Sequence, residues 1–255
     1  MRATDFSNIL FQAMQLCGLD REDFNTYTFG QLRDLASARL RMAWEYDRWQ
    51  ELVKIEKVNT VTTNGVVYFM VPDTYGEILG VYTADPAATT RVQDVGYDLQ
   101  PFNDGMRCVL AKKNAEVWVE YRTVPPSLYG NPYDSAVIYY PGSQVYFDSA
   151  SGTGNFTPAI GKPYYGNFYT CKVQAAAGQD PGNPSHAAKW EKVKIPYIFA
   201  NYLARAVNSD YLRSEGMQEL ALQAEQEATG QLLLEIDKMG RQQGLTRKIN
   251  FINPY

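Results

Sequence analysis

The chain is poor in the residue types from which most catalytic centres are built. It has one histidine, His186, and three cysteines, Cys17, Cys108 and Cys171, which lie far apart and form no Cys-x-x-Cys pair. Scattered cysteines of odd number favour neither a zinc site nor a disulfide framework. His186 follows Asn-Pro-Ser in a turn-like context, with no second histidine to assist it. We therefore expect no catalytic residues, no metal site and no cofactor.

Clustered positive charge and long apolar runs are also missing. The net charge is −4, whereas a protein that holds DNA by its phosphates needs concentrated Lys and Arg. Only transient contact with double-stranded DNA is compatible with this balance. No run of about 18 apolar residues occurs, and the N-terminus, with Arg2 and Asp5, lacks the apolar segment of a secretion signal. We expect a protein made in the cytoplasm and without a membrane span.

Helical periodicity is present near both ends. Residues 5–19 carry apolar side chains at spacings of three and four and stop at Gly18. A longer helical block covers residues 29–55, and Thr28 with Gln31 predicts a capping box at its start.

The C-terminal helical block covers residues 195–240. Glu215-Gly216 divides it, which predicts an antiparallel helix hairpin. In its second helix, the apolar side chains at helical spacing are Leu220, Ala224, Ala228, Leu232 and Ile236.

Strand patterns fill the middle of the chain. Residues 60–71, TVTTNGVVYFMV, place two β-favouring runs around Asn64-Gly65, a strong hairpin signal. Further strands are predicted at 77–83, 106–112 and 115–122, with Lys113-Asn114 as the turn between the last two. We expect these strands to form one antiparallel sheet, and the fold class to be α+β.

Glycine, proline and aromatic residues concentrate in residues 125–190, where short strands are predicted at 137–140, 144–147 and 166–173. The expected organisation is a helical body with an antiparallel sheet, residues 1–133 and 194–240, and an inserted small all-β module, residues 134–193. Residues 241–255 form a basic and then apolar tail, which we expect to act as a docking arm on a neighbouring chain. Its contact residues would be Arg241, Arg247, Lys248, Phe251, Ile252 and Tyr255.

The basic side chains of the second helix allow two interpretations. Arg33, Arg39 and Arg41 could contact DNA phosphates or an acidic neighbouring subunit, or they could simply keep a helix face solvated. Glu45, Asp47 and Glu51 also lie close in sequence, and a glycosidase needs only two carboxylates. A surface charge lattice with Arg48 explains them equally, so a cell-wall hydrolase remains only an alternative.

The layout resembles that of tailed-bacteriophage head-to-tail joining proteins, the adaptor or gatekeeper type that includes tail tubular protein A. The resemblance covers roughly residues 1–125 and 195–245. It rests on the early short helix, AWEYDRW at 43–49, VWVEYR at 117–122, PYIFANYLA at 196–204 and the acid-rich stretch 215–237. It implies that residues 1–133 and 194–240 form an adaptor body.

The inserted segment resembles small chitin-binding-type (carbohydrate-binding family 5/12-like) β modules. The matching runs are YPGSQVYF at 140–147, GNFYTCKVQ at 166–174 and KWE at 189–191, although an added loop at 149–166 departs from the pattern. This resemblance nominates Tyr169 and Trp190 for contact with a sugar or a protein partner, while a core role for Trp190 stays open. A carbohydrate- or receptor-binding tail protein is the alternative function.

The adaptor resemblance implies a structural virion protein rather than an enzyme. Such a protein forms a homo-oligomeric ring of about twelve copies between the portal protein and the tail or nozzle protein, at the neck of the virion. The helix hairpin and the long helix would supply the lateral faces of the ring. The ring would seal the DNA-filled head, provide the docking platform for the tail and form a channel for DNA ejection.

Overall fold

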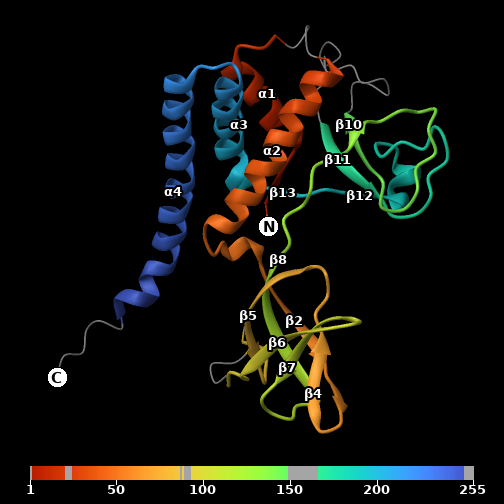
Figure 1. Cartoon of the computed structure of the whole chain (residues 1–255), viewed down its shortest axis with the longest axis vertical. Coiled ribbons are helices and arrows are strands. Elements are labelled where there is room, and N and C mark those ends of the chain that lie inside the picture. Colours follow the sequence, from red (N-terminus) through yellow and green to blue (C-terminus); the bar gives the residue numbers. More distant parts are fainter. Residues whose placement is uncertain (1, 21–24, 87, 89–92, 149–165, 250–255) are drawn as a thin grey trace. The chain divides into compact units, whose positions relative to one another are not determined.

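The computed structural model describes residues 2–20, 25–86, 88, 93–148 and 166–249, with side chains to residue 241 (Figure 1). The fold is α+β, with N-terminal helices, a C-terminal antiparallel helix hairpin and several mainly antiparallel sheets. The chain forms two compact units, Arg48–Pro125 and the combination of Met1–Asp47 with Pro126–Tyr255. This division differs from the expected one, which joined the strands before residue 125 to the helices and set the module 134–193 apart.

The unit Arg48–Pro125 begins with a short 3-10 turn, η1 (Gln50–Leu52), and then forms two antiparallel sheets. A three-stranded sheet has the order β2-β8-β5, and a four-stranded sheet has the order β3-β4-β7-β6. The strand bounds are β2 (Val53–Asn59), β3 (Val61–Thr63), β4 (Val66–Met70), β5 (Tyr75–Tyr82), β6 (Tyr97–Phe102), β7 (Gly105–Leu110) and β8 (Glu116–Thr123).

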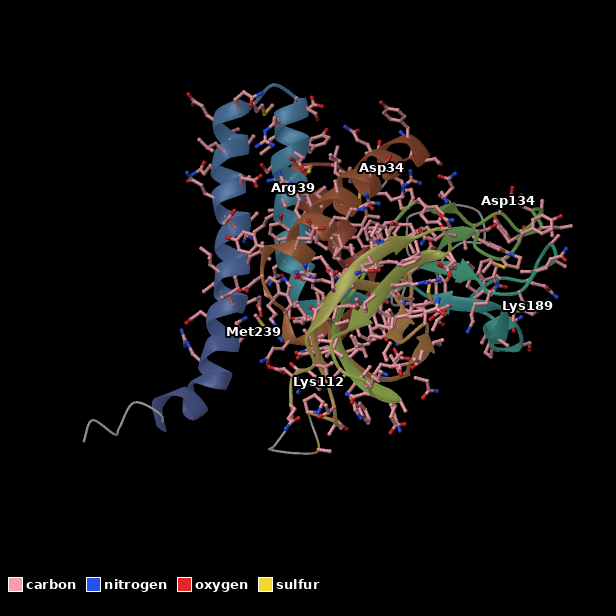
Figure 2. All side chains as sticks on the ribbon, turned by 60° about the horizontal axis from the view of Figure 1, so that its bottom comes forward. Asp34, Arg39, Lys112, Asp134, Lys189 and Met239 are labelled. Carbon is pink, nitrogen blue, oxygen red and sulfur yellow. The ribbon has the colours of Figure 1, made fainter. Side chains whose placement is uncertain are left out.

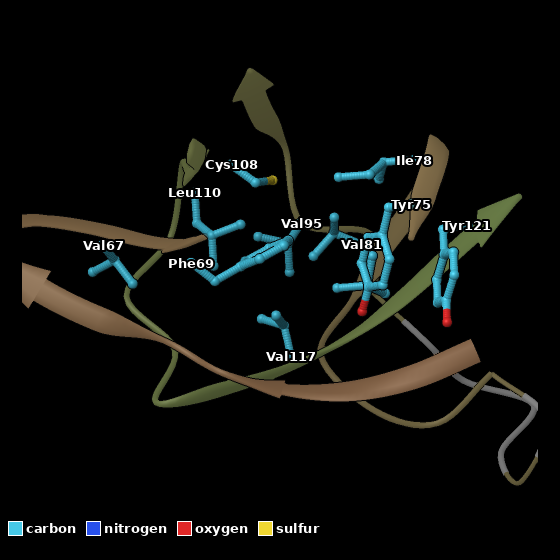
Figure 3. Close-up of a cluster of buried hydrophobic side chains, with 11 residues drawn as sticks. Val67, Phe69, Tyr75, Ile78, Val81, Val95, Cys108, Leu110, Val117 and Tyr121 are labelled. Atoms are coloured by element: carbon cyan, nitrogen blue, oxygen red, sulfur yellow. The ribbon is translucent and has the colours of Figure 1, made fainter. Parts of the chain in front are cut away.

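The two sheets share one apolar core, because alternate residues of each strand point inward (Figure 3). Val67, Phe69, Cys108 and Leu110 come from the four-stranded sheet. The three-stranded sheet contributes Ile78, Val81, Val117, Val119 and Tyr121. The hairpin between β3 and β4 is confirmed, since Asn64 and Gly65 have positive φ values of 53° and 82°.

Two predictions for this unit are wrong. The strands at 106–112 and 115–122 were expected to be partners, but β7 pairs with β4 and β6, whereas β8 pairs with β2 and β5. The helix expected over 29–55 ends at Tyr46. Residues 53–59 form β2 instead, because seven residues pair in register with β8, and long-range pairing outweighs local helical preference.

The other unit begins with β1 (Ala3–Thr4), α1 (Phe6–Cys17) and α2 (Thr26–Tyr46). Gly18 ends α1 in the left-handed conformation, φ 69°, as its position predicted. The cap of α2 is Asn25 rather than Thr28: its side-chain oxygen accepts hydrogen bonds from the backbone N–H groups of Tyr27 and Thr28, at 2.9 and 3.1 Å.

The C-terminal hairpin consists of α3 (Ala200–Ser214) and α4 (Gln218–Ile249), which run side by side in Figure 1. Gly216, with φ 80°, makes the reversal between them. Before α3 come β13 (Ile195–Pro196), which pairs with β1, and a 3-10 turn, η3 (Tyr197–Phe199). α4 was expected to stop near Gly240, but it continues to Ile249. No helix in the described part of the chain has the length and apolarity needed to cross a membrane.

The predicted module is a four-stranded sheet with the strand order β12-β11-β10-β9. In chain order its strands are β9 (Asn131–Pro132), β10 (Gln144–Asp148), β11 (Gly166–Cys171) and β12 (Trp190–Lys192). The short helix η2 (Pro184–Lys189) precedes β12. The strand predicted at 137–140 is reduced to a single bridge between Tyr139 and Ala175.

Aromatic side chains join this small sheet to the helices. Phe6 of α1 lies 4.8 Å from Phe168 of β11, and Phe29 of α2 lies 4.8 Å from Tyr146 of β10, as measured between ring centroids. All four side chains are buried. The module therefore shares its core with the helical body, which explains why both belong to one compact unit.

Candidate interaction surfaces

A buried arginine connects the three longest helices. The guanidinium of Arg39, on α2, donates two hydrogen bonds of 2.6 Å to Asp210 on α3. It donates two more, of 2.7 and 2.6 Å, to Glu225 on α4. Arg39 is only 5% exposed (Figure 2). The expectation that Arg39 contacts DNA or a neighbouring subunit is therefore wrong, because its donors are directed into its own fold.

The charges in this network stabilise one another. The hydrogen bonds from Arg39 to Asp210 raise the pKa of the guanidinium, against the effect of burial. Burial is the largest single effect on the pKa of Glu225 and would raise it. The hydrogen bond and charge of Arg39, together with Ser209 and Arg213, outweigh burial and hold that pKa below its usual value. Ser209 supports the same carboxylate, with its hydroxyl 3.0 Å from Glu225 Oε2. The network is thus a structural clamp that fixes α4 against α2 and α3.

The other two arginines of α2 hold the segment that leads into the small sheet. Arg33 Nη1 donates to the carbonyl oxygens of Tyr129 and Gly130, at 3.1 and 3.2 Å, and to Asn131 Oδ1 at 2.9 Å. Arg41 Nη2 lies 3.2 Å from Ser127 Oγ and stays exposed. Arg33 is therefore engaged within the fold, whereas Arg41 keeps a surface position.

The two faces of α4 differ sharply. Towards α3 it presents small side chains, and Ala221, Ala224, Ala228 and Leu232 are buried. Leu220, which was expected on this face, is 53% exposed. Leu222, Leu233 and Leu234 are 59%, 53% and 53% exposed, and with Leu220 they form what we call the α4 outer face. At 3.6 residues per turn, Leu220 and Leu234 lie on one flank of this face and Leu222 and Leu233 on the other. Such a group of exposed leucines on one helix marks an interaction surface more often than a monomer surface.

The module does not present its tryptophan to solvent. Trp190 is 6% exposed, donates its indole N–H to the carbonyl of Gln179 at 3.0 Å and packs edge-on against Tyr139. Tyr169 is half-buried against Phe147. Neither side chain forms an open platform for a sugar ring. Two other tyrosines, Tyr129 and Tyr140, are 53% and 60% exposed.

The two sheets of the unit Arg48–Pro125 have different outer surfaces. That of β2-β8-β5 carries ion pairs: Lys57–Glu116 at 2.7 Å, Arg122–Glu77 at 2.9 Å and Arg48–Glu120 at 2.5 Å. The surface of the four-stranded sheet, which we call the sheet outer face, is instead apolar, with Val61, Val66, Met70 and Phe102 exposed.

The predicted docking arm, residues 241–255, is described in its backbone to residue 249. Arg241 is exposed and pairs with Asp237 within α4. Arg247 and Lys248 belong to the last turns of α4, and only their backbone is described. Phe251, Ile252 and Tyr255 lie outside the described residues. Where α4 is described, the arm is a continuation of the helix rather than a separate segment.

The remaining candidates for chemistry are structural. Burial raises the pKa of the Cys17 and Cys108 thiols to about 12, so both stay protonated at neutral pH. His186 is half-buried in η2. Among the described residues, no three His, Cys, Asp or Glu side chains gather as metal ligands would.

No protein-family model matches the chain, and no curated protein matches it. The two surfaces that the structure adds were not nominated from the sequence, although signals for both existed. Leu232, Leu233 and Leu234 are consecutive, and three successive helical positions cannot all face one neighbour. In β4, whose sequence is VVYFM, both faces of the strand carry apolar or aromatic side chains.

Proposed function

We propose that this chain is a structural virion protein of a tailed bacteriophage, a head-to-tail connector of the adaptor or gatekeeper type. In this role it forms a homo-oligomeric ring between the portal protein and the tail or nozzle protein. The ring seals the DNA-filled head and leaves a channel for ejection. Its location is the neck of the virion.

The observation that carries the proposal is the α4 outer face. Leu220, Leu222, Leu233 and Leu234 are each more than half exposed on one long helix that the Arg39 clamp holds in place. Burying each leucine against another chain is worth about 1.5–3 kcal/mol. A rigid helix with this surface suits repeated association with like subunits better than it suits a solitary enzyme.

The remaining roles follow from the sequence resemblance and from charge. The C-terminal residues, with Arg241, Arg247 and Lys248 before Phe251, Ile252 and Tyr255, serve as the docking arm for the portal or a neighbouring subunit. The net charge of −4 lets DNA pass with only transient contact, because anionic surfaces repel phosphates. The proposed role is mechanical and uses neither a metal nor a cofactor.

The test is the assembly state of the full chain, alone and with the portal protein. Light scattering and electron microscopy should show closed rings of about twelve copies, or rings that form when portal is added. Immunogold labelling should place the chain at the neck of the virion. A chain that stays monomeric with portal, or labels another part of the particle, contradicts the proposal.

A second candidate, a carbohydrate- or receptor-binding tail protein, has one specific observation in its favour. Tyr129 and Tyr140 are exposed on the small sheet region, and the Tyr129 hydroxyl is fixed by donating to the carbonyl of Gly142 at 2.8 Å. Exposed and anchored aromatic rings suit stacking on sugars. Glycan-array binding that disappears in Tyr140→Ala would favour this candidate over the ring.

A further inference from the structure

The sheet outer face is apolar across several strands. Strand alternation turns Val67 and Phe69 of β4 into the core and Val66, Tyr68 and Met70 outward. Tyr68 lies opposite Val61 on β3 and opposite Val109 on β7, so an apolar row crosses three strands. Two-sheet units with one exposed apolar face of this kind commonly bury it against a partner.

The other sheet of the same unit is the internal comparison. Its outward side chains include Lys57, Glu120 and Arg122, each in an ion pair. Both sheets pack against the same apolar core, so the core requires each of them to bury only its inner face. The apolar character of the sheet outer face is therefore a local feature and needs its own explanation.

The sheet outer face is also fixed in shape. The guanidinium of Arg107 lies over the rings of Tyr68 and Phe102, 4.5 and 4.0 Å from their centroids, and its Nη2 donates to Asp104 at 2.8 Å. Stacked in this way, Arg107 holds two aromatic side chains in place before any partner arrives. A pre-organised surface loses less conformational entropy on binding.

The charges around this face lean positive. The hairpin 61–70 contains no charged residue. Arg107 is paired with Asp104, so the charges that remain are Asp98 on β6 and Lys112 and Lys113, which follow β7. Lys112 and Lys113 are exposed, and no ion pair is described for either (Figure 2). A complementary partner is therefore apolar and acidic.

The α4 outer face has this chemistry. It carries the exposed side chains of Leu220, Leu222, Leu233 and Leu234. From Gln218 to Asp237, α4 contains no Lys or Arg. Four of its acids are already paired within the chain: Glu225 with Arg39, Glu227 with Arg205, Glu235 with Lys238 and Asp237 with Arg241. The fifth, Glu219, has no ion pair among the described residues. Glu219 is exposed on the same helix, beside Leu220.

We propose that the α4 outer face of one copy docks on the sheet outer face of the next copy, with Glu219 near Lys112 and Lys113. The inference rests on the proposed ring and names the two surfaces that meet in it. The contact is heterologous: each copy uses its helix on one side and its sheet on the other. Repetition of such a contact gives a closed ring when the rotation closes.

The experiment uses two double variants of the full chain. The sheet variant is Val66→Glu with Phe102→Glu, and the helix variant is Leu222→Glu with Leu233→Glu. All four positions are at least 46% exposed, so folding should be kept, which circular dichroism and thermal unfolding check. Each variant alone should lose the ring and run as a 28.8 kDa monomer. An equal mixture should give a one-to-one dimer and nothing larger, because one intact helix then meets one intact sheet.

Two control variants carry the same charge on other surfaces. Ile55→Glu changes an exposed side chain on the other sheet, and Met42→Glu changes one on α2. Both should keep the ring. The inference is overturned if the sheet variant or the helix variant still forms rings, or if the mixed variants stay monomeric. It is also overturned if the control substitution Met42→Glu abolishes assembly.

The outcomes separate this inference from the proposed function. Rings that survive the sheet variant leave the connector role standing and refute only the named contact. Rings that depend on both faces but never bind portal, or are absent from the neck, support the contact and refute the connector role. A wild-type chain that is monomeric with and without portal refutes both.

Discussion

The guanidinium of Arg39 and the carboxylate of Glu225 face each other through two hydrogen bonds, 2.7 and 2.6 Å long, across the interface of α2 and α4. Against α3, α4 otherwise packs with Ala221, Ala224, Ala228 and Leu232. The partly buried charge pair adds to this packing in fixing the position of α4, and with it the direction of the α4 outer face.

Replacing Arg39 by Met should destabilise the larger unit. The change leaves Asp210 and Glu225 without their partner, and we expect a loss of about 2–3 kcal/mol, somewhat below the figure for fully buried pairs because both carboxylates keep some solvent contact. Urea unfolding followed by circular dichroism measures it. Arg41→Met, on the exposed side of the same helix, should change stability by no more than about 0.5 kcal/mol. Equal effects of the two substitutions would refute the clamp.

The same pair predicts an acid dependence. The pKa of Glu225 is lower in the folded chain than its ordinary value of 4.5, so on acidification the unfolded state takes up the proton first. The stabilisation is complete above pH 4.5 and is lost as pH falls from there through the lowered pKa. Glu225→Gln should lower stability at neutral pH and flatten this part of the profile. Urea midpoints between neutral and acid pH measure it.

Two glycines give opposite predictions for one substitution. Gly65 has φ 82°, which an L side chain rarely adopts, so Gly65→Ala should cost about 1–2 kcal/mol. Gly30 lies within α2, and an added Cβ would meet nothing within 4 Å, so Gly30→Ala should stabilise by about 0.5–1 kcal/mol. Thermal unfolding of both variants tests the pair. A destabilised Gly30→Ala or a neutral Gly65→Ala would contradict the backbone assignments.

Trp190 should behave as a core residue. Trp190→Ala removes a buried indole and should cost about 3–5 kcal/mol. Trp190→Phe keeps most of the packing, loses the hydrogen bond to the Gln179 carbonyl and should cost less. Tyr140→Ala, at a position 60% exposed, should be nearly neutral. Chemical unfolding measures all three, and a neutral Trp190→Ala would instead indicate a surface role for the indole.

Much of the fold could be predicted because its signals are local. The three-and-four spacing of residues 5–19, the Asn64-Gly65 turn and the break at Gly216 depend only on neighbours in the sequence, and each appears in the structure. Periodicity shows that a segment has an inner face. It does not show which element covers that face.

The errors in strand pairing and in the role of Arg39 concern partners that are distant in the sequence. Pairing with β8 turned residues 53–59 into a strand, and β7 joined a different sheet from β8, because many strand pairings satisfy the same alternation. Arg39 was expected at the surface because arginine is usually exposed; only the approach of Asp210 and Glu225, from two other helices, allows its burial.

The sequence by itself determined the α+β class, the scarcity of residues for chemistry and the negative charge, since composition and short-range spacing are enough for these. Tertiary structure decided which arginines are engaged, which face of α4 keeps its leucines in solvent and which sheet exposes apolar side chains. The physical reason is that a side chain is buried only by contact between two surfaces, and the sequence pattern describes one of them. A residue is inside or outside only once another part of the chain, or another copy of it, lies against it.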